Sequence, residues 1–199
     1  MRSAFLFSCA LLAATAAFAE TRVDVRDVVH HPFSTDFAAG HRLRLHVRSG
    51  EIRIVGTNEN RITVELSGRK AYDAGDVRVR MTEKDGDAVL RITGGHRDEI
   101  TTTIRIPRQT DLFARIPFGD VSVENVEGSK DIELHAGDMT IGVGNPSDYS
   151  HVDASVNTGD LDGRPFGESK EGFFRSFRKQ GDGKYRLHAH VGAGDLTLR

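Results

Sequence analysis

The sequence predicts an all-β protein that folds as a short-stranded, β-helix-like β-solenoid with one irregular insertion. Three observations lead to this prediction. A phrase made of glycine, an acidic residue and an apolar-polar-apolar triplet returns along the chain, many short segments alternate between apolar and polar residues, and glycine is abundant, with 21 residues. One turn with one brief strand cannot bury its apolar face alone, so a recurring unit of this kind indicates neighbours stacked above and below it.

The returning phrase predicts the corners of the solenoid. Glycine allows the positive φ of a tight turn and lets neighbouring coils approach closely. The acid that follows accepts hydrogen bonds from backbone N–H groups at the corner, and the next apolar residues point inward. The copies begin at Gly50-Glu51, Gly119-Asp120, Gly137-Asp138, Gly159-Asp160 and Gly194-Asp195, and the copy at Gly159 is shortened.

The spacing of the corners predicts the length of a coil and marks an insertion. From Gly119 to Gly137 is 18 residues and from Gly137 to Gly159 is 22, which is close to one solenoid coil. From Gly159 to Gly194 the spacing is 35 residues. The excess falls in residues 164–184, so we expect this block to loop out of one coil.

The corner acids also allow a second interpretation, in which they stack as a row of carboxylates and bind calcium. The acids concerned are Glu51, Asp120, Asp138, Asp160 and Asp195. Calcium-binding β-rolls use a denser Gly-Gly-x-Gly-x-Asp nonapeptide, which this sequence lacks. Turn formation is therefore the favoured role for these acids.

The strands themselves are predicted by period-two alternation, which places every second side chain on one face. Residues 41–199 are expected to form a single solenoid domain, preceded by an extended lead-in segment at 20–40. Alternating segments occupy 42–48, 62–66, 77–81, 89–92, 104–106, 132–134, 152–154 and 185–191.

The first 19 residues predict a secretory signal peptide. Arg2 precedes an apolar run, and the small residues Ala17 and Ala19 occupy the two positions that matter before the expected cleavage after Ala19. The run is too short for a transmembrane anchor, so no transmembrane segment is expected after signal removal. Cleavage would remove Cys9, the only cysteine, and leave no disulfide or thiolate metal site. The mature chain is expected in the periplasm, at the cell surface or in the medium.

Net charge argues against a nucleic-acid partner. The formal charge of the full chain is -2, and loss of Arg2 would make it -3. Nucleic-acid-binding domains are usually strongly basic. We therefore expect no nucleic acid among the partners.

Several of these segments together resemble the bacterial putative-adhesin domain family of unknown function. The resemblance rests on 50–56, on 104–107, on 118–123 with Gly128, and on the repeated Gly-Asp turns. It covers roughly residues 40 to 199 and implies an exported or envelope-associated β-solenoid with short strands. The family offers no catalytic residues to carry over, and the insertion at 164–184 departs from its simple repeat.

The insertion concentrates aromatic and basic residues. One interpretation is a loop that docks a partner protein, a glycan or an anionic membrane surface. The other is that its phenylalanines fold back and cap the end of the solenoid, which needs protection against edge pairing. The candidate partner-binding residues are Phe173, Phe174, Arg175, Phe177, Arg178 and Lys179.

Two histidines suggest a metal site. His188 and His190 lie two apart on a predicted strand and project from the same face, a spacing that zinc can use. A third ligand would come from His135 or His151 on neighbouring coils. Solvent-facing polar positions are the favoured interpretation, so no metal or cofactor is expected.

The sequence contains no clustered catalytic chemistry. It has no Gly-x-Ser-x-Gly elbow and no phosphate-binding loop in a strand-to-helix setting. We therefore expect a non-enzymatic, adhesin-like binding or scaffolding protein of the cell envelope, with an envelope protein or a glycan as partner. The alternatives are a polysaccharide-active β-helix enzyme and an envelope-sensing regulatory module that acts through a protein partner.

Overall fold

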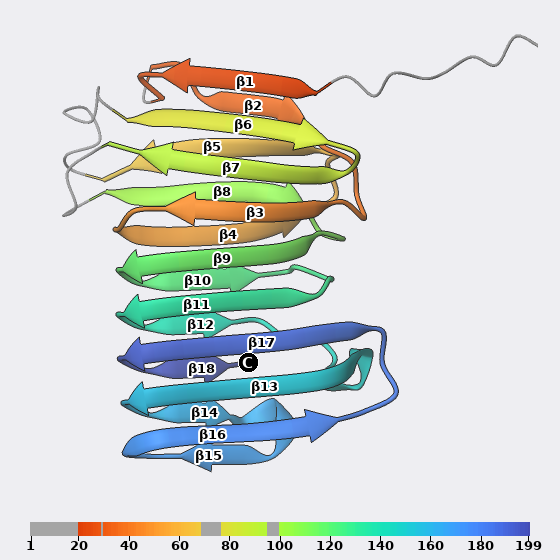
Figure 1. The fold of residues 1–199 in the computed structure, drawn as a ribbon, viewed down its shortest axis with the longest axis vertical. Helices are drawn as coiled ribbons and strands as arrows, with labels where there is room; N and C mark the ends of the chain where they lie inside the picture. The colour runs from red at the N-terminus through yellow and green to blue at the C-terminus, as the bar shows by residue number, and fades with distance from the viewer. Residues whose placement is uncertain (1–19, 29, 69–76, 95–99) are drawn as a thin grey trace, which may run out of the picture.

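The computed structural model describes residues 20–28, 30–68, 77–94 and 100–199. This part of the chain is all-β and builds two large mixed sheets that face each other along a tall stack (Figure 1). Its only helical segments are two short 3-10 turns, η2 (Pro146–Asp148) and η3 (Arg164–Phe166). None of its helices has the length and apolar character needed to cross a membrane. The predicted signal peptide lies outside the described residues.

Each sheet contains nine strands. In spatial order, the first sheet consists of β1 (Thr21–Arg26), β6 (Arg78–Lys84), β7 (Asp87–Thr93), β3 (Arg42–Val47), β9 (Asp111–Phe118), β11 (Lys130–Ala136), β17 (Tyr185–Ala193), β13 (Tyr149–Thr158) and β16 (Phe173–Gln180). The second sheet consists of β15 (Glu168–Lys170), β14 (Leu161–Gly163), β18 (Leu196–Leu198), β12 (Met139–Ile141), β10 (Val121–Glu124), β4 (Glu51–Thr57), β8 (Thr101–Pro107), β5 (Arg61–Ser67) and β2 (Phe33–Asp36).

The core lies between the two sheets because the strands alternate in sequence. Leu43 and Leu45 of β3 point inward and are buried, whereas the arginines and the histidine between them stay outside. The short strands of the second sheet do the same, with Val121 and Val123 of β10 buried. One apolar cluster runs through the whole stack. The outward faces are therefore free to carry polar side chains.

The chain crosses from the first sheet to the second at the Gly-acid corners, and these corners stack on one another. A backbone ladder joins them: the Gly119 N–H donates to Ala136 O at 3.0 Å, and the Gly137 N–H donates to Ala193 O at 2.9 Å. At Gly137, where φ is +127°, an added Cβ would overlap the carbonyl of Gly119. Only glycine fits such a close approach.

The acids at the corners form a second ladder. The carboxylate of Asp120 accepts a hydrogen bond from the Asp138 N–H at 3.2 Å, and Asp138 in turn accepts from the Asp195 N–H at 2.9 Å. Asp195 then accepts from the Asp160 N–H at 2.9 Å. Each of these carboxylates therefore satisfies a backbone donor of the next corner.

The strands do not stack in the order of the sequence. β17 lies between β11 and β13, and β18 lies between β12 and β14, all in parallel (Figure 1). The corner of Gly194 therefore separates the corners of Gly137 and Gly159. After β11 and β12, the chain skips one position in each sheet and continues with β13 and β14. After β16 it turns back, and its last two strands, β17 and β18, occupy the skipped positions.

The insertion at 164–184 is not the irregular loop that its composition predicted. It contains β15 and β16, which pair antiparallel with β14 and β13 and cover the last edge of each sheet. Only Phe177 is buried among the residues of β16, so the strand lacks the alternation that would have revealed it. At the other end, the lead-in segment 20–40 holds β1 and β2, which pair antiparallel with β6 and β5.

Candidate functional site

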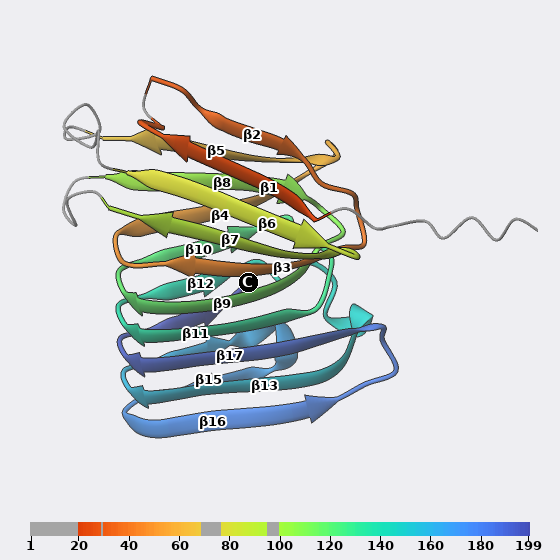
Figure 2. The same ribbon diagram turned by 45° about the horizontal axis from the view of Figure 1, so that its top comes forward.

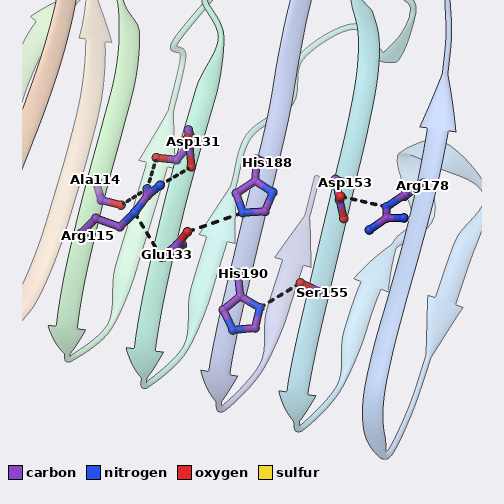
Figure 3. Close-up of polar contacts among 9 residues, drawn as sticks. All are labelled: Ala114, Arg115, Asp131, Glu133, Asp153, Ser155, Arg178, His188 and His190. Atoms are coloured by element: carbon purple, nitrogen blue, oxygen red, sulfur yellow. Dashed lines mark hydrogen bonds and ion pairs between the residues drawn. The ribbon is translucent and has the colours of Figure 1, made fainter.

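The outward side of five strands in the C-terminal half of the first sheet forms a polar surface, which we call the histidine face. It consists of the outward side chains of β9, β11, β17, β13 and β16 (Figure 3). Because the strands are in register, Asp131, His188 and Asp153 lie side by side across three of them. Glu133, His190 and Ser155 form the next row.

Arg115 links the two acids of β11 to β9. Its Nη2 lies 2.9 Å from Asp131 Oδ1, and its Nε lies 3.1 Å from Glu133 Oε2. Its Nη1 also donates to the carbonyl oxygens of Ala114 and Asp131, at 3.0 Å each. One guanidinium therefore balances two carboxylates (Figure 3).

The two histidines of β17 have different partners. His188 Nε2 lies 3.7 Å from Glu133 Oε1, an ion pair when the ring is protonated. His190 Nδ1 lies 2.9 Å from Ser155 Oγ, in a hydrogen bond. The spacing of the two residues correctly placed both rings on one face. However, the groups nearest to the rings are Glu133 and Ser155, not another histidine.

A metal ion could be held by a different set of ligands. Single ligand atoms of Asp131, Glu133 and His188 all lie within 4.8 Å of one another. The predicted third ligands are not among these three: the ring of His135 packs edge-on against Phe118, and His151, although it lines the same depression as His188, is the register partner of Arg186. Arg115 already neutralises both carboxylates, so an ion would have to displace it. This competition weakens the case for a metal centre.

A depression of about 620 Å³ opens on the histidine face. Its walls carry hydrogen-bond donors, acceptors and one aromatic ring, which suits a polar ligand better than an apolar one. Asp153, one of the lining residues, accepts a hydrogen bond at Oδ2 from Arg178 Nε of β16 at 2.9 Å. The lining includes Phe113, Arg115, Asp131, Asp153, Arg186 and His188.

The six residues predicted for partner binding divide between two roles. Phe177 is 5% exposed and packs against the buried Phe166, with ring centroids 6.2 Å apart. Lys179 Nζ donates to Phe166 O at 3.0 Å, which ties the strand to η3. Phe173 and Phe174, by contrast, are 68% and 81% exposed. The insertion therefore covers the core with one phenylalanine of β16 and leaves two at the surface.

The two remaining residues of that set are basic and lie on β16. Arg178 belongs to the histidine face through Asp153. Arg175 is exposed and is the register partner of Val156. The six residues thus do not converge on one site.

Sequence reasoning missed a buried cation beneath the histidine face. Lys130 is 1% exposed, and its Nζ donates to Tyr149 Oη at 2.8 Å and to Gly128 O at 3.2 Å. Tyr149 Oη donates in turn to Val143 O at 3.0 Å. Burial lowers the pKa of Lys130 to about 8 and raises the pKa of Tyr149 above its usual value. The available signal was a lysine at an inward position of an alternating strand.

Comparisons with known proteins identify the fold. No family model matches the chain, and no curated protein is similar to it in sequence. A crystal structure described as a putative cell adhesion protein from Clostridium sporogenes ATCC 15579 superposes with a TM-score of 0.51 and 14% identity, over 84% of this chain and 99% of that chain. A putative adhesin from Bacteroides fragilis NCTC 9343 matches with a TM-score of 0.32 and 9% identity, over 84% of this chain and 96% of that chain. At such low identity, the first match shows a shared all-β fold.

Proposed function

We propose that this protein is an exported, adhesin-like binding or scaffolding protein of the cell envelope, built as a short-stranded β-solenoid of the putative-adhesin kind. The stacked Gly-acid corners support the solenoid. The fold shared with a protein described as a cell adhesion protein supports the adhesive role. The composition of residues 1–19 supports export.

The observation that carries the proposal is the long outward side of the first sheet. Strands from distant parts of the sequence lie side by side there, over the full height of the stack (Figure 1). Their outward positions carry polar side chains that the register aligns in rows. Such rows can make many simultaneous hydrogen bonds and ion pairs with an extended ligand, as a binding or scaffolding protein requires.

The pairing of the acids supports a non-enzymatic role. A glycoside hydrolase needs two carboxylates, one of them able to deliver a proton at neutral pH. On the histidine face, Arg115 holds Asp131 and Glu133, and Arg178 holds Asp153. These carboxylates are therefore engaged by guanidinium groups of the protein rather than left open to a glycosidic oxygen.

Fractionation and binding test the proposal. N-terminal sequencing of the protein from the periplasm, the surface and the medium should find a chain that begins near Glu20. That chain should bind isolated cell envelopes saturably, and a panel of polysaccharides should show no turnover. Retention of the full chain in the cytoplasm would contradict export, and release of reducing ends from any polysaccharide would contradict the non-enzymatic role.

A further inference from the structure

The N-terminal half of the first sheet carries a surface of a different kind, which we call the basic face. It consists of the outward side chains of β1, β6, β7 and β3, four adjacent strands that form one layer (Figures 1 and 2). Its cationic members are Arg22, Arg26, Arg42, Arg44, Arg78, Arg80, Lys84 and Arg91.

The charge on the basic face is strongly one-sided. The eight cationic side chains face only two outward carboxylates on these four strands, Asp24 and Asp87, so six positive charges are in excess. The full chain, in contrast, has a formal charge of -2. A positive surface on a slightly negative protein concentrates anions at one place.

The two carboxylates are already occupied. Arg78 and Arg80 both pair with Asp24, and the hydrogen bond from Arg78 is the main reason that the pKa of Asp24 falls to about 2. Asp87 lies 3.3 Å from Arg42 Nη1 and 3.9 Å from Arg44 Nη1. Among the described residues, no carboxylate pairs with the other four cations, which are Arg22, Arg26, Lys84 and Arg91.

Register lines up several of these charges across the sheet. Arg80 is opposite Arg91, Arg91 is opposite His46, and His46 is opposite Arg115 of the histidine face. Neighbouring strands lie about 4.8 Å apart, so four cationic or titratable side chains form one straight row. Like charges directly opposite each other destabilise a sheet, and a bound polyanion would relieve that repulsion.

His46 reflects this positive environment. Burial first, and the nearby Arg91 second, hold the pKa of His46 below its usual range. The groups that face it across the sheet are Arg91 on β7 and Arg115 on β9. An anion placed along the row would lie within reach of all three side chains.

We propose that the basic face binds a linear anionic polysaccharide, whose carboxylate or sulfate groups lie along the row from Arg80 through Arg91 to His46. The proposal rests on the proposed function, since an envelope protein meets such polymers. A membrane surface fits less well, because no phenylalanine, tyrosine or tryptophan side chain projects from these four strands to insert among lipids. Single-stranded nucleic acid fits less well for the same reason, since its bases stack on aromatic rings.

Titration of the exported chain with oligogalacturonate tests the proposal. We expect saturable binding that weakens as salt rises, because ion pairs with a polyanion release its counterions. The double variant Arg80→Gln/Arg91→Gln should weaken binding by about tenfold or more, at roughly 1.4 kcal/mol per tenfold. The matched control Arg53→Gln/Arg61→Gln removes the same charge from the second sheet and should change binding less than about twofold.

Further measurements separate the possible failures. The single variant Arg91→Glu should also weaken oligogalacturonate binding. It replaces the double variant as the test if the double variant proves unstable. The proposal is wrong if both double variants weaken binding equally, if no anionic polysaccharide binds at low salt, or if anionic vesicles or single-stranded DNA bind more tightly than oligogalacturonate. Saturable envelope binding by the unaltered chain, without oligogalacturonate binding, would remove this inference and leave the proposed function standing.

Discussion

The two halves of the outward side of the first sheet share one backbone register but organise charge in opposite ways. On the basic face, eight cationic side chains surround two carboxylates. On the histidine face, Arg115 balances Asp131 and Glu133, and Arg178 balances Asp153. The difference shows that the register of the strands sets the positions of the outward side chains. The residue type at each position then decides whether the surface is positive enough to attract a polyanion, or nearly neutral and rich in hydrogen-bonding groups.

The interior differs between the halves as well. The core beneath the histidine face encloses Lys130 and the Tyr149 hydroxyl, whereas none of the described residues buried beneath the basic face is charged. Exposed ion pairs contribute little to stability, so neither outward face holds the fold together. The corners and the buried side chains must do so, and the largest predicted effects therefore lie there.

The stacked glycine corners should be the most sensitive points. Gly137→Ala places a Cβ on the carbonyl of Gly119, and neither backbone can move without loss of the ladder. We expect a loss of unfolding free energy on the order of 4 kcal/mol or more. Gly144→Ala is the control, because Gly144 also has positive φ but an open surrounding, and it should cost only about 1 kcal/mol. Equal losses in urea unfolding would show that the corners do not depend on close approach.

The cap beyond the histidine face comes next. Phe177→Ala removes a buried ring that packs on Phe166, and should lower the unfolding free energy by about 3 kcal/mol. Phe174→Ala changes an exposed ring and should cost less than about 0.5 kcal/mol. A thermal melt of each variant measures this difference. A larger loss of stability for Phe174→Ala than for Phe177→Ala would show that Phe177 is not the ring that caps the core.

Lys130 should make the stability of the C-terminal half depend on pH. Its pKa is about 8 in the folded chain against 10.5 as the ordinary value, so the folded state binds fewer protons between these limits. The stabilisation is present above pH 10.5 and is lost as pH falls through 8. Relative to wild type, Lys130→Met should therefore be more stable at pH 7 than at pH 10.5, by up to about 3 kcal/mol.

Urea unfolding at the two pH values measures this relative stability. Lys84→Met, at an exposed lysine, is the control and should differ from wild type by the same small amount at both pH values. A pH-independent difference for Lys130→Met would mean that the buried amine stays fully charged.

The smallest effects compare the two outward faces directly. Arg115→Gln leaves two carboxylates unbalanced and should lower the unfolding free energy by up to about 1 kcal/mol. Arg91→Gln relieves repulsion and should raise it by about 0.3 kcal/mol. Urea unfolding at low and high salt measures both effects, and salt should shrink both. If both variants changed the unfolding free energy in the same direction, the two faces would not differ in the way described.

Local patterns were sufficient to predict the all-β class and most strand positions. Alternation depends only on neighbours in the sequence, so segments such as 42–48 were recognised with their buried and exposed sides correctly assigned. β16 was not predicted because Phe177 is its only buried residue, and a single inward residue gives no alternating pattern. The burial of Lys130 was not predicted, because an inward position on an alternating strand leads to burial only when the neighbouring strands pack around it.

The order in which the strands stack within each sheet could not be predicted from the sequence. The corners at Gly159 and Gly194 are chemically alike, and local sequence does not say which of them lies against Gly137. That choice depends on β16, which covers the outer edge of β13 and sends the chain back. The rows of both outward faces depend on the same long-range pairing, so His188 could be placed on a face but not beside Glu133.

Mapping by NMR is the measurement that tests the central claim most directly. Backbone amide shifts of a chain that spans residues 20–199, followed during titration with oligogalacturonate, report which of the two faces the polymer contacts. The account predicts shift changes concentrated on β1, β6, β7 and β3 that fade along the row at Arg115. Changes centred on β11, β17 and β13 instead would contradict it.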